Sequence, residues 1–186
     1  MRTLHVVVVL LLITSRAGAQ SLNPGPPGPF VVDVRGVTSG VPTASALYPD
    51  LTFQDPVPSR GFGFDIGAHV YHFHLGPARL GLGANYIRVN ATATNAHVNL
   101  QMFAPQLSFN FGTANGWSFL SAGLGPVRVL GDRRFDTTAL NAGGGARWFT
   151  SNHIAIGFDV RLHKLAAIKT FPQTMLVSAS VGLSVK

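Results

Sequence analysis

The tripeptide Asp-Val-Arg occurs twice in the sequence, at 33–35 and at 159–161. Each copy places a carboxylate and a guanidinium two residues apart, the spacing that puts both side chains on one face of a β-strand. Groups of opposite charge form strong hydrogen bonds when they are buried together, whereas a buried charge without a partner is strongly destabilising. The repeat therefore predicts ion pairing between two distant segments, provided that the fold brings them together.

Three histidines, His69, His72 and His74, are close enough in the sequence to suggest a metal site. On a strand, His72 and His74 share one face while His69 lies on the other, so the three rings do not converge. The sequence contains no Glu and no Cys that could add ligands. We therefore expect no metal and no cofactor, and interpret the three histidines as packing residues.

Two Ser–His pairs could support nucleophilic catalysis: His153 with Ser151, and His97 with Ser108. Neither pair has a recognisable acidic residue to orient the histidine, or an established common face. The sequence also shows no phosphate-binding loop, redox motif or nucleic-acid stacking platform. These observations predict a protein that is not an enzyme and does not bind nucleic acid.

The first residues have the features of a secretory signal peptide. Arg2 supplies the positive charge, 6–13 is an unbroken apolar run, and 17–19 is a small-residue cleavage pattern. The apolar run is too short to cross a bilayer as a helix. We predict a cleaved signal peptide at 1–19, a Pro/Gly-rich lead-in at 20–29 and one folded domain at 30–186.

The composition indicates a protein with one face turned away from bulk water. Hydrophobic residues make up 46% of the chain and charged residues 11%, against about a quarter charged in ordinary soluble proteins. There is no Glu and there are three Lys, although both residue types coat the surfaces of soluble proteins. For an exported chain, the formal net charge of +7 favours anionic lipid headgroups as the counter-charge.

Beyond the lead-in, segments of alternating hydrophobicity are separated by turn residues. The alternation has the period of a β-strand, and several segments exceed the roughly nine residues that cross a bilayer at a tilt. The eight predicted strands are 30–36, 61–75, 79–89, 98–111, 117–129, 140–149, 154–163 and 174–186. The alternation slips near Pro105, which predicts a bulge at that residue.

The connections between the predicted strands are alternately long and short. The short connections are 75–78, 112–116 and 150–153, and the long ones are 37–60, 90–97, 130–139 and 166–173. Short turns at one end and long loops at the other are typical of a transmembrane barrel with both chain ends on the periplasmic side. We therefore predict an all-β fold, an eight-stranded antiparallel up-and-down transmembrane β-barrel.

Two further features indicate that the apolar faces point outward to lipid. The polar faces carry mostly Gly, Ser and Asn, whereas a water-facing surface would carry Lys and Glu. Aromatic residues gather near the short turns, as in an interfacial girdle: Tyr71, Phe73, Phe109, Phe111, Trp117, Phe119, Trp148 and Phe149. The alternative is a soluble or periplasmic β-barrel that holds an apolar ligand inside.

With the apolar faces outward, the charged residues of the strands project into the lumen. The predicted lumen cluster contains Asp33, Arg35, Asp65, His69, Arg147, Asp159, Arg161 and His163. The closing strand offers small inward residues, Ser178, Ser180 and Gly182, so the two Asp-Val-Arg copies can meet across it. Because an eight-stranded lumen is just wide enough for side chains to fill, we interpret the cluster as a plug; the alternative is a proton or ion path.

Basic residues near the long loops form a predicted basic rim: Arg60, Arg88, Arg128, Arg133, Arg134, Lys164 and Lys169. Their charged groups could bind the phosphates of lipopolysaccharide in the outer leaflet. The alternative is ordinary solvated loop charge, partly offset by Asp50, Asp55, Asp132 and Asp136.

The stretch 141–149, Asn-Ala-Gly-Gly-Gly-Ala-Arg-Trp-Phe, together with 154–163, resembles the small outer-membrane β-barrel domain family of the OmpA/OmpX-like type. That family commonly shows a Gly-alternating strand, an Arg-aromatic pair, a short turn and a strand ending in acid-x-Arg. The resemblance implies an integral protein of the cell outer membrane, inserted by the barrel assembly machinery, with roles from membrane integrity to adhesion. Two features depart from the family: no peptidoglycan-binding domain follows, and 184–186 is Ser-Val-Lys where many members end in an aromatic residue.

These features together lead us to expect a monomeric, non-enzymatic outer-membrane protein with a structural or surface-interaction role. Its contacts would be made through the loop 37–60 and the basic loop around Arg133. An outer-membrane enzyme that modifies lipid A is the alternative from another class, and it predicts a Ser and a His converging on the lipid-facing surface.

Overall fold

The structure is a computed structural model that describes residues 28–52, 55–168 and 171–186. The predicted signal peptide at 1–19, most of the predicted lead-in at 20–29 and the rim residue Lys169 lie outside these described residues. In the described ranges, no helix has the length and apolar character needed to cross a membrane.

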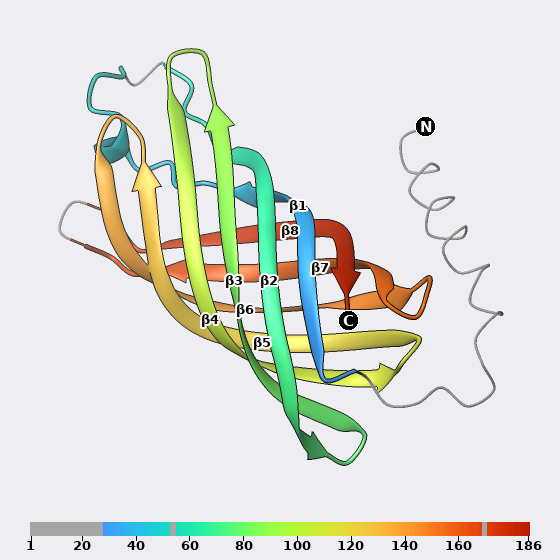
Figure 1. Ribbon diagram of the computed structural model, residues 1–186. Coiled ribbons are helices and arrows are strands. Elements are labelled where there is room, and N and C mark those ends of the chain that lie inside the picture. Colours follow the sequence, from blue (N-terminus) through green and yellow to red (C-terminus); the bar gives the residue numbers. More distant parts are fainter. Residues whose placement is uncertain (1–27, 53–54, 169–170) are drawn as a thin grey trace, which may run out of the picture.

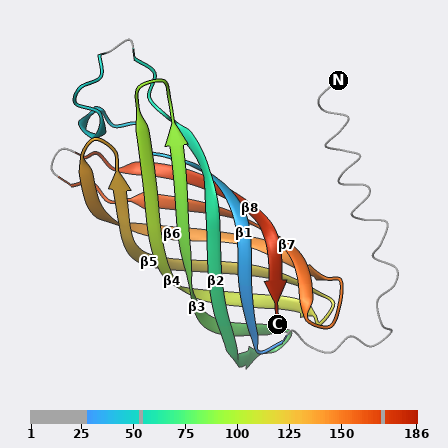
Figure 2. The same ribbon diagram turned by 45° about the horizontal axis from the view of Figure 1, so that its top comes forward.

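Eight antiparallel strands close into a barrel, in which every strand pairs with its neighbours in the sequence and β1 pairs with β8 (Figure 1, Figure 2). The strands are β1 (Phe30–Gly40), β2 (Arg60–Leu75), β3 (Ala78–Thr92), β4 (His97–Thr113), β5 (Gly116–Leu130), β6 (Arg134–Phe149), β7 (Ile154–Leu165) and β8 (Thr174–Val185). The predicted eight-stranded antiparallel up-and-down barrel is therefore confirmed.

Over most of the height of the barrel, the apolar face of each strand is the outer face. Ile156, Val177 and Val181 have exposed fractions of 50%, 43% and 62%. The inward side chains of Asp159 and Arg161 are 3% and 2% exposed. A soluble barrel around an apolar ligand would show the opposite arrangement, so the outward orientation of the apolar faces is confirmed for this part of the wall.

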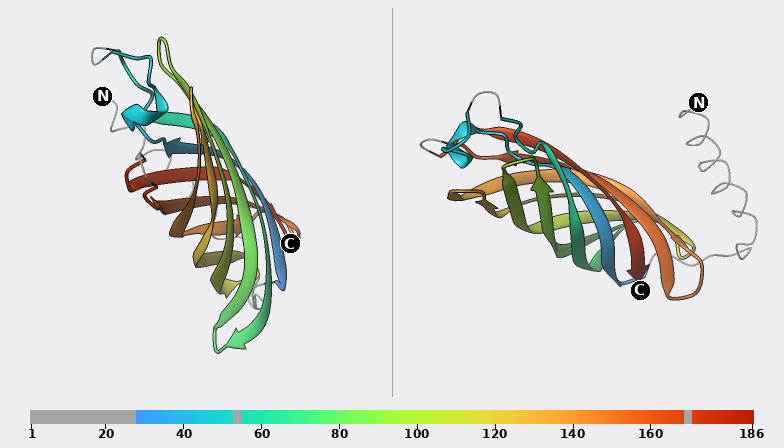
Figure 3. Two further views of the ribbon diagram at one scale, coloured as in Figure 1. Left: turned by 90° about the vertical axis from the view of Figure 1, so that its left-hand side faces the viewer. Right: turned by 90° about the horizontal axis from the view of Figure 1, so that it is seen from above.

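The short turns lie at one end of the barrel and the long connections at the other (Figure 3). The short turns are residues 76–77, 114–115 and 150–153. At the long-loop end, three connections are shorter than predicted: residues 41–59 instead of 37–60, 93–96 instead of 90–97, and 131–133 instead of 130–139. The strands on either side continue because they stay paired beyond the membrane-spanning length; β4 has 17 residues, against the nine to eleven or so that cross a bilayer.

Near the long-loop end, the two faces of the wall exchange their chemistry while the alternation continues. On the long-loop side of Pro105, the inward residues of β4 include Leu100 and Met102, both buried, whereas Gln101 faces outward. The predicted bulge at Pro105 is wrong, because Pro105 stays in register opposite Ala84 of β3. The slip in the sequence pattern marks a change of environment. Between Phe103 and Gln101 the outer face of β4 changes from apolar to polar, and from Met102 toward the long loops its inner face is apolar.

An apolar core fills the interior at the long-loop end. Inward side chains of β3, β4 and β5 pack there against two residues of the loop between β1 and β2. Leu47 is the last residue of the short 3-10 helix η2 (Ser45–Leu47), and Tyr48 follows it. The backbone N–H of Asp132 donates to the carbonyl oxygen of Leu47 at 3.2 Å. Burial and the nearby Asp132 carboxylate raise the pKa of Tyr48 to about 12, so its phenol stays neutral. This end of the barrel is closed by apolar packing.

Aromatic residues close the interior at the short-turn end. Tyr71 and Trp117 are buried there with Val31, and Phe149 packs against them. The side chain of Lys186 lies over these rings, with Nζ 3.8 Å from the centre of the Phe149 ring and 5.6 Å from that of Trp117. The polar part of the lumen is therefore enclosed between two apolar clusters.

The predicted interfacial girdle is correct only in part. Tyr71, Trp117 and Phe119 occupy inward positions and are buried, whereas Phe73 and Trp148 are exposed on the outer face. The register of β2 against β3 shifts between Tyr71 and Phe73, which changes the facing of the strand at that point. Position in the alternation, rather than nearness to a turn, decides which aromatic side chains lie outside.

The exchange of environment on β4 predicts where the bilayer ends. Because the chain contains no cysteine, a spin label attached to a single introduced Cys reports on that position alone. In vesicles, a spin label at Phe103→Cys should be relaxed by oxygen dissolved in lipid, and a label at Gln101→Cys by a water-soluble nickel complex. The outward Leu107 is the reference for a position inside the hydrocarbon. Equal oxygen accessibility at 101 and 107 would contradict this boundary.

Candidate functional site

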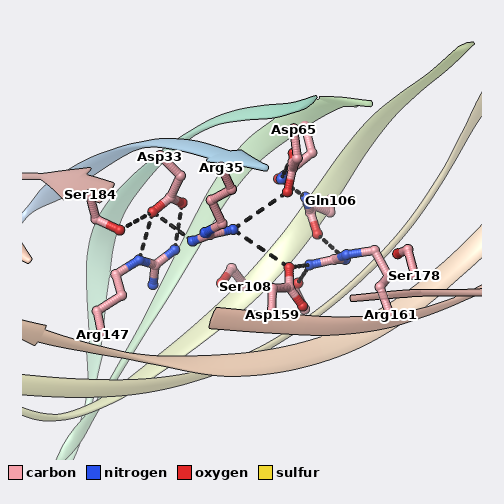
Figure 4. A network of polar contacts seen from close by, with 12 residues as sticks. Asp33, Arg35, Asp65, Gln106, Ser108, Arg147, Asp159, Arg161, Ser178 and Ser184 are labelled. Atoms are coloured by element: carbon pink, nitrogen blue, oxygen red, sulfur yellow. Dashed lines mark hydrogen bonds and ion pairs between the residues drawn. The ribbon is translucent and has the colours of Figure 1, made fainter. Parts of the chain in front are cut away.

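The densest group of polar side chains lies in the middle of the lumen (Figure 4). All eight residues of the predicted lumen cluster point inward and are buried, and they come from β1, β2, β6 and β7. Among them, the formal charges balance: the acidic residues are Asp33, Asp65 and Asp159, and the arginines are Arg35, Arg147 and Arg161. The interior is therefore a set of paired charges rather than a field of one sign.

Asp33 is the centre of the half nearer the short turns. Arg147 of β6 donates to it twice, from Nε to Oδ1 at 2.9 Å and from Nη2 to Oδ2 at 2.6 Å. Ser184 of β8 donates to Oδ1 at 2.5 Å, and Arg35 Nη2 lies 2.6 Å from the same oxygen. The Arg147 guanidinium also lies over Phe119, with Cζ 4.0 Å from the ring centre. Two-point contacts of this kind fix geometry as well as charge, so they hold β1 and β6 in place across the lumen.

Arg35 connects the three aspartates of the cluster. Besides its contact with Asp33, its Nη1 lies 3.6 Å from Asp65 Oδ2 and 3.7 Å from Asp159 Oδ2. Figure 4 shows its guanidinium between the two halves of the network. Among the described residues, Arg35 is the only cation within ion-pair distance of Asp65. Loss of Arg35 would therefore disconnect the halves and leave a carboxylate without a cation.

Arg161 is the centre of the half nearer the long loops. Its Nη1 donates to Gln106 Oε1 at 2.7 Å and to Asn141 Oδ1 at 2.9 Å. Its Nη2 donates to Ser121 Oγ at 2.8 Å and to Asp159 Oδ2 at 2.7 Å. These partners come from β4, β5, β6 and β7, so one guanidinium joins four strands.

Asn85 and Gln106 complete the connection between the halves. Gln106 donates to Asn85 Oδ1, and Asn85 Nδ2 donates to Asp65 Oδ1 at 2.7 Å. With these amides, every strand of the barrel contributes a side chain to the network. The sequence-based prediction did not include the amides or Ser121, although all lie at inward positions of predicted strands.

The closing strand allows the two Asp-Val-Arg copies to meet. On β8, Ser180 is opposite Asp159 and Gly182 is opposite Arg35. These small side chains leave space above the strand, and Arg35 of β1 reaches Asp159 of β7 across it. The sequence places small residues at the one strand that must be crossed.

The remaining two members of the lumen cluster are histidines at opposite ends of the network. His163 Nε2 lies 3.0 Å from Ser178 Oγ, and the ring of His69 stacks on Tyr71 with the ring centres 6.2 Å apart. In the part of the chain that the structure describes, no group of three acidic or histidine side chains could hold a metal ion.

In the part of the chain that the structure describes, neither of the two Ser–His pairs considered from the sequence is joined through the histidine ring. Ser108 is buried in the lumen with its Oγ 3.1 Å from the hydroxyl of Tyr71, while His97 is exposed at the long-loop end of β4. His153 and Ser151 share a short turn, where Ser151 Oγ accepts from the backbone N–H of His153 at 3.4 Å. The histidine ring is not directed at the serine in that contact.

The basic rim does not form one site. Arg60, Arg88, Arg128, Arg133, Arg134 and Lys164 are all exposed, and they are distributed over the barrel from β2 to β7. The closest grouping involves Asp136, which accepts from Arg128 Nε at 3.0 Å and from Arg134 Nε at 2.8 Å. Arg88 lies on β3 of the same wall.

No known protein family matches the chain, and no curated protein matches it in sequence. Solved structures do match. The barrel is similar to Neisserial surface protein A, with a TM-score of 0.60, 16% identity, and coverage of 86% of this chain and 97% of that one.

Two further solved structures are similar over nearly their whole length. Ail, the attachment invasion locus protein of Yersinia pestis, has a TM-score of 0.50, 12% identity, and coverage of 86% of this chain and 98% of that one. The outer membrane enzyme PagL has a TM-score of 0.51, 16% identity, and coverage of 84% and 99%. At these identities the similarity shows the fold, which is that of the small eight-stranded outer-membrane β-barrels.

Proposed function

We propose that the protein is a monomeric integral barrel of the Gram-negative outer membrane whose lumen is a structural plug, and that it acts through its surface rather than by catalysis or transport. The observation that supports this most strongly is the lumen itself. A charge-balanced network joins all eight strands, and apolar clusters lie at both of its ends. Filled lumens are expected at this strand number.

The outer surface supports an outer-membrane location. A belt of exposed apolar side chains surrounds the barrel, and a polar wall follows it at the long-loop end. The structural neighbours are outer-membrane proteins, and the predicted signal peptide and insertion by the barrel assembly machinery agree with this location. The long-loop end then faces the cell exterior, and the short turns face the periplasm.

The proposed surface role rests on the loop of residues 41–59 and the turn at 131–133, which are joined through Asp132 and Leu47. Ail, one of the similar structures, is described as an attachment protein, while PagL is described as an enzyme. Among the described residues, the Ser–His contacts lie in the lumen, between Ser178 and His163, and in a periplasmic turn. The first contact is buried and the second lies in an exposed turn on the periplasmic side, away from the outer leaflet that holds lipid A, so we favour interaction over lipid A modification.

Electrophoresis and bilayer recordings test this proposal. Unheated protein in detergent should run ahead of heated protein, because a lipid-embedded barrel stays folded, and the reconstituted protein should show no steady ion conductance. The mass of lipid A incubated with the protein should not change. Partition into buffer without detergent would contradict the location, steady conductance would contradict the plug, and loss of an acyl chain from lipid A would contradict the non-enzymatic role.

A further inference from the structure

A recess of about 180 Å³ lies on the outer wall of the barrel where the apolar belt gives way to polar side chains. We call it the boundary recess. Its apolar side is formed by Tyr86, Phe103 and Pro126, and its polar side by Gln101, Arg128 and Asp136. The lining of the recess therefore complements an amphipathic ligand, which has one apolar part and one polar part.

The backbone explains why the recess forms here. The ladder between β4 and β5 has no paired residues between the Met102–Val127 pair and the Gln106–Gly123 pair. Pro105 and Pro126 lie in this interval, and proline has no N–H to donate to a ladder. The ladder of paired residues is therefore interrupted at the point where the outer surface changes from apolar to polar.

Two arginines flank the polar side of the recess. Gln101 has Arg88 as its cross-strand neighbour on β3 and Arg128 on β5. Since adjacent strands are about 4.8 Å apart, the two arginine backbones are separated by about 10 Å, and their long side chains can reach one anion between them. Arg88 forms no ion pair with any described residue, whereas Arg128 shares Asp136 with Arg134. The three arginines and Asp136 together leave an excess of two positive charges on this wall.

From this arrangement we infer that the boundary recess binds the phosphate of an outer-leaflet glycolipid of the lipid A class. The phosphate lies between Arg88 and Arg128, where guanidinium groups can make charge-assisted hydrogen bonds. The adjoining lipid packs on Tyr86 and Phe103, and its acyl chains continue along the apolar belt at Leu107 and Leu124, which are exposed. This inference rests on the proposed outer-membrane location and names the lipid for one part of the basic rim.

The position of the recess favours a membrane lipid over a soluble phosphate compound. Phe103 is exposed on the lipid side and Gln101, two residues away on the same face, is on the polar side. A ligand that fills both parts must carry an anionic group and a hydrocarbon group at this spacing. A soluble phosphate would occupy the arginine side and leave the aromatic side uncovered.

The test uses the whole barrel in phosphatidylcholine nanodiscs that contain either bisphosphorylated lipid A or the same lipid after removal of its phosphates. Native mass spectrometry counts the lipid A molecules that each barrel retains. The wild type should prefer the phosphorylated lipid by at least about tenfold, which corresponds to the loss of one or two charge-assisted contacts in its absence. The double variant Arg88→Gln with Arg128→Gln should lose this preference.

A matched control removes the same charge elsewhere on the rim: Arg60→Gln with Lys164→Gln, at the long-loop ends of β2 and β7. This control should keep the preference, and excess inorganic phosphate should not displace the lipid. Equal loss in both double variants would overturn the site in favour of diffuse attraction, and displacement by inorganic phosphate would overturn the lipid as ligand. A barrel that does not enter nanodiscs at all would instead contradict the proposed membrane location.

Discussion

Replacing Arg35 with Met is expected to lower the free energy of unfolding by roughly 3–5 kcal/mol, the range seen when one partner of a buried ion pair is removed. Arg35 lies 2.6, 3.6 and 3.7 Å from the three lumen aspartates. Without it, Arg147 and Arg161 must balance three buried carboxylates, and Asp65 keeps no cation within ion-pair distance among the described residues. Urea unfolding in detergent micelles, followed by tryptophan fluorescence, measures the difference.

A second substitution separates the loss of charge balance from the loss of packing. In the Arg35→Met background, Asp65→Asn should restore part of the stability, because it removes the carboxylate that has lost its cation. The same Asp65→Asn change in the wild type should be destabilising, since there it breaks the pairing with Arg35. Arg133→Met, in the exposed turn between β5 and β6, should change stability by less than about 0.5 kcal/mol. If Arg35→Met behaves like Arg133→Met, the network does not stabilise the barrel.

The barrel itself was predictable because its physical constraint is repeated in every strand. A closed wall between lipid and a filled lumen requires an alternation of period two over eight consecutive segments, and the sequence shows that alternation. The same alternation predicts that the Asp and Arg side chains of 33–35 and 159–161 point into the lumen. Pairing of residues from β1 and β7 could be anticipated because both strands flank β8, whose inward residues are small.

The long-loop end was harder to predict, because alternation does not state which face meets water. Leu100 and Leu107 are equally apolar in the sequence, yet one is buried in an interior core and the other is exposed on the belt. In the sequence this change of environment resembles a bulge at Pro105, and the polar outward residues near Asn90 and Arg134 resemble loop residues. Tertiary context, in this case the apolar core around Leu47, decides the environment of these strand ends.

The amide side chains that form hydrogen bonds with the charged residues could not be predicted from the sequence either. Asn85, Gln106 and Asn141 are ordinary amides at inward positions, and nothing local distinguishes them from solvated side chains. They become identifiable once the register between strands is known, because register determines which inward residues share a level. A buried guanidinium such as Arg161 needs several acceptors, so unassigned inward amides on neighbouring strands are the signal to seek.

The second large effect is expected at Gly182, where the last strand pairs with the first. A Cβ atom at this position would lie 2.6 Å from Cα of Arg35 and would also collide with the backbone oxygen of Val34. Both contacts are with the backbone of β1, which cannot move without breaking the seam between β1 and β8. Gly182→Val should therefore cost more than the roughly 1–3 kcal/mol of ordinary overpacking, and most of the protein should fail to show the unheated gel shift.

Gly36 offers a matched control on the same seam. It faces outward on β1 opposite Val181, and the nearest atom to an added Cβ is the Val181 backbone oxygen at 3.9 Å. Gly36→Val should fold with the wild-type gel shift, because the added side chain enters open space on the lipid-facing wall and valine suits a strand better than glycine. Equal folded yields of the two variants would show that close approach at Gly182 does not control closure. A loss confined to Gly182→Val would assign closure to the inward face of β8, the face across which Arg35 and Asp159 meet.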